Sequence, residues 1–142
     1  MGPDLAAANV NRSYQLGGTS IAIFTFMLIF LYPRFAAGEV NAVLFQATLI
    51  VMALATFSFV LATFTYYAAS LAGRFEEAQR SSYARRGDRF WLLGYSLLLL
   101  DPCLILLCVG LVLVAATWFG LWLVYLVVSV RNFPRVQTAS HD

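Results

Sequence analysis

Asp101 is the one ionisable residue deep within an apolar run of this 142-residue chain. It stands in the segment Leu-Leu-Leu-Leu-Asp-Pro-Cys-Leu, residues 97–104. An aspartate at mid-membrane depth costs about 2.5 to 3.5 kcal/mol on insertion scales, so its presence needs a physical reason. The sequence leaves two such reasons open, one structural and one functional.

The structural reason is a broken helix. Asp-Pro is typical of a helix start, with Asp101 as N-cap and Pro102 at the first helical position. If the helix runs through, Pro102 instead frees the carbonyl of Leu98. The functional reason is an ion or proton site at a discontinuous helix, where transporters often place one. Tyr95, Ser96 and the hydroxyls of the preceding helix are then the expected partners of the carboxylate.

Other polar residues could also serve transport. Glu39 lies at the mouth of the predicted second helix, where a carboxylate either interacts with the helix N-terminus or contributes to a ring at an oligomeric pore. Hydroxyl side chains within that helix could line a pore and supply oxygens to partly dehydrated ions. These candidates are Thr56, Ser58, Thr63 and Thr65. Because four short spans enclose no aqueous path alone, a pore requires a homo-oligomer.

The sequence carries no enzyme signature, metal site or cofactor motif. With His141 as the single histidine, the sequence offers no bis-His haem site and no zinc cluster. Cys103 and Cys108 would point to different faces of a helix, too far apart for a disulfide, and are expected to be buried thiols. There is also no catalytic triad, no shared carboxylate pair and no Gly-rich phosphate loop.

The small residues of the second helix have a further interpretation as a packing seam. Leu-Ala-Thr-Phe at residues 54–57 returns at residues 61–64, and such a heptad repeat is typical of a left-handed helix pair. In lipid, close backbone approach through small residues replaces the hydrophobic drive between helices. The predicted seam consists of Thr48, Ala55, Ser58, Ala62, Thr65, Ala69 and Ala72.

The composition of the chain indicates that its helices lie in a lipid bilayer. The chain is 61% apolar and 11% charged, whereas about a quarter of the residues in a soluble domain are charged. The sequence therefore predicts an all-α membrane protein, a single four-transmembrane-helix bundle with a long second helix and a short basic cytoplasmic loop. The expected spans cover about 16–32, 41–72, 90–110 and 112–131, with the last turn either at Gly110 or at about 115–117.

The ends of the first span are marked by polar and helix-breaking residues. Residues 1–15 are expected to form a short mobile arm. Ser13 or Thr19 could cap the first helix, and Pro33 is expected to end it.

Residues 73–89 form the only strongly polar internal segment, expected to be helical to about Ala84 with a turn at Gly87. All nine basic residues of the chain are arginines, which bind phosphate headgroups bidentately. The headgroup candidates in this segment are Arg74, Arg80, Arg85, Arg86 and Arg89. If this segment lies in the cytoplasm, four spans place both termini there as well, and Arg34 is then the only arginine outside. The expected location is a plasma or inner membrane.

Taken together, these features predict a homo-oligomeric ion channel or transporter. The alternative is a non-transporting scaffold or accessory subunit of a larger membrane complex, since every feature also has a structural explanation. The expected partners are the lipid bilayer and either a second copy or another membrane subunit. The net charge of +2 is too small to indicate nucleic acid.

Overall fold

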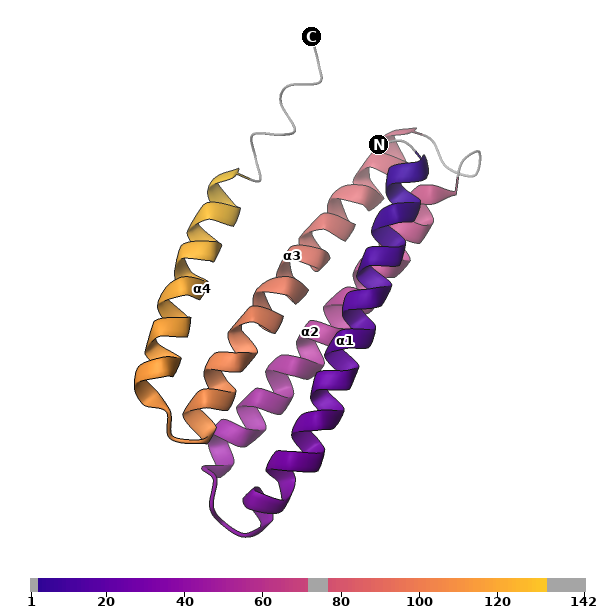
Figure 1. The fold of residues 1–142 in the computed structure, drawn as a ribbon. Coiled ribbons are helices and arrows are strands. Elements are labelled where there is room, and N and C mark those ends of the chain that lie inside the picture. The colour runs from indigo at the N-terminus through magenta and orange to yellow at the C-terminus, as the bar shows by residue number, and fades with distance from the viewer. Residues whose placement is uncertain (1–2, 72–76, 133–142) are drawn as a thin grey trace.

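The computed structural model describes residues 3–71 and 77–132. These residues form four helices, α1 (Pro3–Ala36), α2 (Ala42–Ser70), α3 (Glu77–Cys108) and α4 (Val112–Asn132) (Figure 1). All four are long and apolar enough to cross a membrane, and the described residues contain no strand. The predicted all-α architecture with four candidate spans is confirmed, and it indicates a small integral membrane protein.

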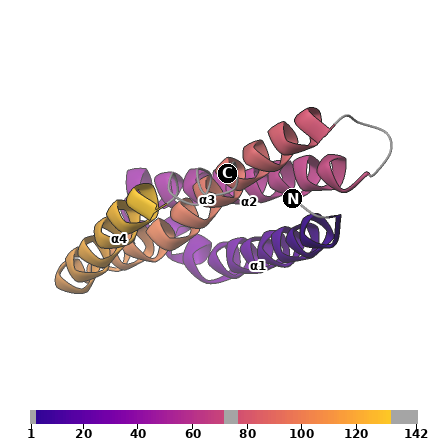
Figure 2. The same ribbon diagram turned by 90° about the horizontal axis from the view of Figure 1, so that it is seen from above.

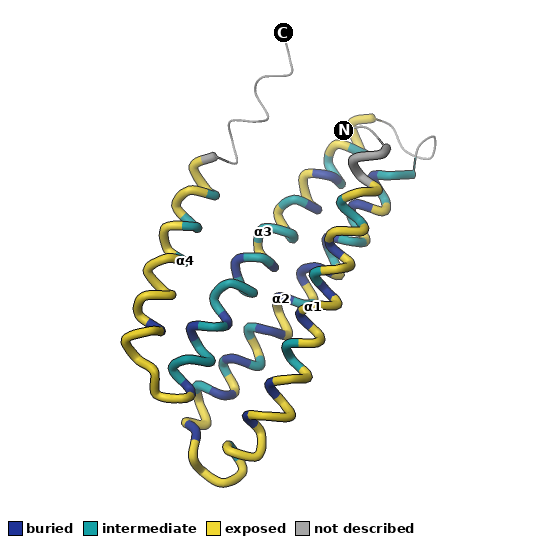
Figure 3. Tube along the Cα trace, viewed as in Figure 1, coloured by how far each residue is buried: buried dark blue, intermediate teal, exposed yellow. Residues whose placement is uncertain are grey.

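The helices form an open row. α2 packs along both α1 and α3, α4 packs only against α3, and α1 barely reaches α3 (Figures 1 and 2). The helices with more neighbours are more buried. α2 and α3 carry most of the buried positions, while α4 is exposed along nearly its whole length (Figure 3). The wide apolar surfaces this leaves are those expected of a chain whose solvent is lipid.

Two glycines end helices at one end of the molecule, here called the loop end, which holds the turns 37–41 and 109–111. Gly38 has φ 74° and Gly110 has φ 81°, the left-handed conformation that a helix stop requires. Glu39 N–H bonds the Arg34 carbonyl at 2.9 Å, and Leu111 N–H bonds the Leu106 carbonyl at 2.9 Å. Both stops are therefore Schellman motifs, and the turn between α3 and α4 lies at the earlier of its two expected positions.

The first helix is longer than expected. It includes the described part of residues 1–15, so a mobile arm there was a wrong prediction. Ser13 is fully buried within α1 and Thr19 bonds the Gln15 carbonyl at 3.0 Å, so neither is an N-cap. Pro33 lies inside α1 and does not end it. The helix ends at Ala36, just before the left-handed Gly38.

The second and third helices also differ from expectation. α2 begins after Asn41, whose side chain accepts from the Val43 and Leu44 N–H groups, and ends at Ser70. The segment from Glu77 onward belongs to α3, so the expected turn at Gly87 is wrong. With 32 residues α3 is about 48 Å long, well over a hydrocarbon core of about 30 Å. The basic segment is thus the polar first part of a spanning helix.

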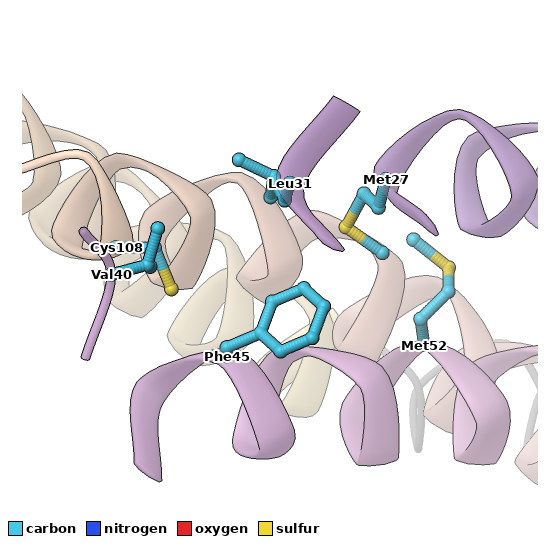
Figure 4. Packing of buried hydrophobic residues seen from close by; sticks show 6 residues of the cluster. All are labelled: Met27, Leu31, Val40, Phe45, Met52 and Cys108. Atoms are coloured by element: carbon cyan, nitrogen blue, oxygen red, sulfur yellow. The ribbon is translucent and has the colours of Figure 1, made fainter. Parts of the chain in front are cut away.

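The apolar core lies towards the loop end, where three helices meet. It combines side chains of α1, α2 and α3 with one from the α1–α2 turn (Figure 4). The members are Met27, Leu31, Val40, Phe45, Met52 and Cys108. This cluster packs α1, α2 and α3 together near the loop end.

Candidate functional site

The buried face of α2 alternates bulky and small residues at intervals of three and four. The bulky positions are Phe45, Met52, Phe59 and Tyr66, and the small positions are Thr48, Ala55, Ala62 and Ala69. The small row lies on the predicted seam. The other predicted row is less enclosed, since Ser58 is buried but Thr65 is half-buried, and Ala72 lies outside the described residues. α2 contacts two helices rather than one, so its buried face is wider than a single heptad seam.

α3 presents a matching row to α2, with Gly87, Gly94, Asp101 and Cys108 buried at seven-residue spacing. A Cβ on Gly87 would lie 2.8 Å from Tyr66 Cε1, and one on Gly94 would lie 3.1 Å from Phe59 Cε1. Tyr66 and Phe59 of α2 therefore each pack onto a glycine of α3.

The same antiparallel register continues towards the loop end. It places Asp101 opposite Met52 and Cys108 opposite Phe45, and the cysteine does pack in one cluster with both α2 side chains (Figure 4). Cys108 Sγ also lies 3.7 Å from Thr48 Oγ1. Asp101 thus occupies a position of the row that elsewhere carries glycine or cysteine.

The Asp101 carboxyl is enclosed and unpaired. Its side chain is 1% exposed, and among the described residues neither carboxyl oxygen has a hydrogen-bond partner. The helices packed against α3 offer no compensating charge here, because α2 has no charged residue and α4 has only Arg131, in its last turn. A buried carboxylate without a partner is costly, so this group is the strongest polar anomaly of the described chain.

The helix-cap explanation of Asp101 is wrong. α3 runs without interruption from Glu77 to Cys108, and both Asp101 and Pro102 lie inside it. Two tryptophans of α4 donate hydrogen bonds to backbone carbonyls of α3 in this region. Trp118 Nε1 donates to the Leu99 carbonyl at 2.7 Å and Trp122 Nε1 donates to the Ser96 carbonyl at 2.8 Å. The carbonyl that Pro102 leaves without a helical donor is that of Leu98, so the two tryptophan bonds join α4 to α3 and do not replace the lost bond.

The hydroxyls of α2 bond to their own helix instead of to Asp101. Each of the expected hydroxyls donates to the carbonyl one turn earlier, at 2.8 to 2.9 Å. Those hydroxyls are Thr48, Thr56, Ser58, Thr63 and Thr65. A hydroxyl whose proton is used this way keeps only lone pairs, so it can accept from a protonated carboxyl but cannot donate to a carboxylate.

The remaining expected site residues lie elsewhere. Tyr95 stacks on Trp91, with ring centroids 5.2 Å apart, and makes a tilted contact with Tyr125, with ring centroids 5.7 Å apart. Ser96 is buried with its carbonyl facing Trp122 of α4. Glu39 is exposed in the turn at the loop end. The structure therefore does not gather the predicted transport residues around one site.

A second polar cluster, at the end of the molecule opposite the loop end, was missed from the sequence. We call this end, which holds the start of α1, the end of α2 and the start of α3, the Arg-rich end. Tyr66 Oη donates to Asp88 Oδ1 at 2.6 Å, and the Arg12 guanidinium lies 4.6 Å above the Trp91 ring. Ser13 Oγ is buried without a partner among the described residues.

The sequence did hold a signal for the α1 part of this cluster. Ser13, Gly17 and Ser20 follow a spacing of four and three, and all three are buried. That is the small-residue spacing expected where another helix approaches closely. A Cβ on Gly17 would lie 3.7 Å from Phe59 Cβ of α2.

Neither cysteine nor any groove offers a conventional ligand site in the described part of the chain. Both cysteines are buried free thiols, and Cys103 Sγ lies 3.4 Å from the Ala115 carbonyl. The described residues contain no group of three or more His, Cys, Asp or Glu side chains that could hold a metal ion. A groove of about 340 Å³ between α3 and α4 and one of about 280 Å³ between α1 and α2 have almost wholly apolar linings.

Comparison of the chain with protein-family models, curated proteins and solved structures finds no match. The functional argument therefore rests on Asp101 and its surroundings.

Proposed function

We propose that this small integral membrane protein is a proton-coupled transporter or channel in which Asp101 takes up and releases the transported proton. One observation carries the proposal: the Asp101 carboxyl is enclosed within the apolar part of α3 and has no hydrogen-bond partner among the described residues. Ionisable groups inside membrane spans mark ion pathways and proton relays by default.

A proton suits this site better than a metal ion. Sodium, magnesium or calcium would need several oxygen ligands and space between them. The register places the thioether of Met52 opposite Asp101, and α2 contains no carboxylate that could share a metal ion with it. A carboxyl group needs no further ligand to hold a proton, and a back-bonded hydroxyl such as Thr48 remains able to accept from it.

Proton exchange requires the α2–α3 seam to open transiently to water. Asp101 lies between two helices of one protomer, so a central pore between copies of the chain would not pass it. Pro102, one residue further on, interrupts the backbone bonding of α3 and is the natural hinge for such opening. We therefore favour a gated path through the protomer, with any homo-oligomer serving stability.

An accessory or scaffold role is the second candidate, favoured by a different observation. The described grooves are apolar and the α2 hydroxyls are committed to their own helix, so no polar path leads to Asp101 in this conformation. A subunit that only packs against other membrane proteins needs no such path. Proton flux separates the two roles.

The test is proton flux into vesicles that contain the purified protein and an internal pH-sensitive dye. The wild type is expected to carry protons down an imposed gradient, and Asp101→Asn is expected to abolish the flux, because asparagine keeps the size but cannot ionise. Glu39→Gln is the matched control, since Glu39 is an exposed carboxylate at the loop end.

The flux comparison requires that the variant is folded. Asp101→Asn is expected to melt at or slightly above the wild-type temperature, because it removes an unpaired ionisable group without changing side-chain volume. Flux in Asp101→Asn equal to the wild type would exclude Asp101 as the site. A wild type without any flux would favour the accessory role.

A further inference from the structure

We propose that the exposed face of α3, with the adjoining end of α4, binds an anionic phospholipid. Its phosphate contacts arginines at the Arg-rich end, and its acyl chains lie along the leucine surface beyond them. This binding site is separate from Asp101 and does not depend on proton exchange.

Three arginines of α3 lie at the depth of lipid phosphate. Arg85, Arg86 and Arg89 are exposed and come just before the apolar part of the helix. Trp91 and Tyr95 follow at once, and such aromatic residues are enriched at the headgroup level of membrane proteins. The guanidinium groups therefore stand where a headgroup phosphate would be.

No carboxylate among the described residues neutralises these arginines. Asp88, the nearest in sequence, accepts a hydrogen bond from Tyr66 and so belongs to the α2 side of the helix. Arg80, another predicted headgroup residue, donates to the Ala69 carbonyl instead, and Arg74 lies outside the described residues. The positive charge at Arg85, Arg86 and Arg89 is thus available for an external anion.

α4 adds a fourth guanidinium at the same end. Trp122 bonds the Ser96 carbonyl and Tyr125 packs on Tyr95, which makes α3 and α4 antiparallel neighbours. Continued for about two turns, this register brings the exposed Arg131, in the last turn of α4, level with about Gly87 of α3. Arginines of two helices therefore converge on one headgroup depth.

The surface beyond the arginines is shaped for acyl chains. Leu93, Leu100, Leu104 and Leu107 follow Arg89 at helical spacing and lie on the same outward face of α3. The last three also line the apolar groove of about 340 Å³ shared with α4. From Arg89 to Leu100 the helix rises about 16 Å, close to half of a hydrocarbon core of about 30 Å. A lipid of one leaflet would reach the start of that groove.

Charge selects an anionic lipid over a zwitterionic one. Guanidinium groups bind phosphate through paired hydrogen bonds. In a zwitterionic lipid the choline cation would face the same arginines and oppose binding. Clusters of arginine next to a spanning helix are the usual recognition element for anionic headgroups.

The test is lipid retention by the purified full chain in native mass spectrometry. The protein is given equal amounts of phosphatidylglycerol and phosphatidylcholine in detergent. The wild type is expected to retain phosphatidylglycerol, and the triple variant Arg85→Gln, Arg86→Gln, Arg89→Gln is expected to lose the preference by about tenfold or more. Arg34→Gln, which removes an exposed arginine at the loop end, is expected to keep it.

A second variant guards against loss of insertion or folding. Replacing the same three arginines by lysine keeps the charge but removes the bidentate fork, so retention is expected to fall between wild type and the glutamine variant. Equal retention of the two lipids by the wild type, or unchanged preference in the glutamine variant, would overturn the proposal. Competition by millimolar inorganic phosphate as effective as competition by added phosphatidylglycerol would show a soluble-anion site and overturn it too.

Discussion

At the scale of single residues, the α2–α3 contact depends on the absence of side chains. The rings of Tyr66 and Phe59 occupy the space that a Cβ on Gly87 or Gly94 would need. Asp101 follows in the same row and fills the space with a carboxyl group instead. A position that packing alone would give to a small apolar residue thus carries an ionisable carboxyl group.

Gly94→Ala tests the close approach. The added methyl would lie 3.2 Å from the Ala55 carbonyl oxygen and 3.1 Å from Phe59 Cε1, so we expect a loss of about 1 to 3 kcal/mol in the free energy of unfolding. Gly120→Ala, in α4, meets nothing within 4 Å and should be neutral or stabilising by up to about 1 kcal/mol. Unfolding in a denaturing detergent measures both. Equal effects of the two changes would refute the predicted packing.

Tyr66→Phe tests the hydrogen bond to Asp88. It removes a 2.6 Å bond while keeping the ring on Gly87, so a destabilisation of about 1 to 2 kcal/mol is expected. Tyr67→Phe removes a hydroxyl from a neighbouring exposed ring and should change little. Both free energies come from the same unfolding assay, and a silent Tyr66→Phe would show that the bond contributes nothing to stability.

The sequence indicated the depth of Asp101 but not its surroundings. Depth follows from the flanking leucines, which any hydropathy reading detects. Whether a carboxyl has a partner depends on which residues of other helices face it. Of the expected partners, Tyr95 packs against Tyr125 of α4, and Ser96 contacts α4 through its backbone carbonyl. The helix break expected at Pro102 was wrong, because α3 continues through Pro102 as far as Cys108.

At the scale of elements, α2 is the central helix because its small residues recur with a heptad period. Ala62 is fully buried in that row, whereas Phe64 is 67% exposed. Ala62→Leu is expected to force α2 away from its neighbours and destabilise by about 1 to 3 kcal/mol, while Phe64→Leu should be nearly silent. Melting temperatures in detergent compare the two. Identical melting temperatures would contradict the assignment of Ala62 to the packed face.

Helix ends were harder to predict than helix faces. The sequence offered Pro33, Gly87 and Gly110 among its stops and turns, but of these three the structure uses only Gly110, and the first helix ends at Gly38. A glycine ends a helix only if the next residues can close a Schellman turn, and a glycine such as Gly87 is equally suited to a helix contact. The two roles look alike in one sequence. The polar composition of residues 77–89 was also misleading. Exposed arginines occur in the protruding part of a long helix as readily as in a loop.

At the scale of the whole molecule, the two sides of the row of helices differ in how closely they are packed. The α1–α2–α3 side holds the buried seam and Asp101, while α4 attaches to α3 mainly through Trp118, Trp122 and Cys103. The chain therefore combines a tightly packed three-helix unit with a more loosely attached fourth helix. Lipid or another subunit would cover the remaining apolar surface.

The arginine asymmetry predicts how the molecule is oriented. A cysteine introduced at Ser81, exposed at the start of α3, should react with a membrane-impermeant maleimide only after the cell membrane is opened. A cysteine at Glu39, exposed at the loop end, should react in intact cells. The buried native thiols should stay unlabelled in both cases. The reverse pattern would contradict the orientation.

The most direct test of the central claim is to observe the proton on Asp101 itself. Carbon-13 magnetic resonance of aspartate-labelled protein in lipid would follow each carboxyl signal across the pH range in which the protein stays folded, with Asp101→Asn identifying the signal. We predict that the Asp101 carboxyl changes between protonated and ionised forms within that range. A signal that stays in one form throughout would contradict proton exchange at Asp101 and, with it, the proposed function.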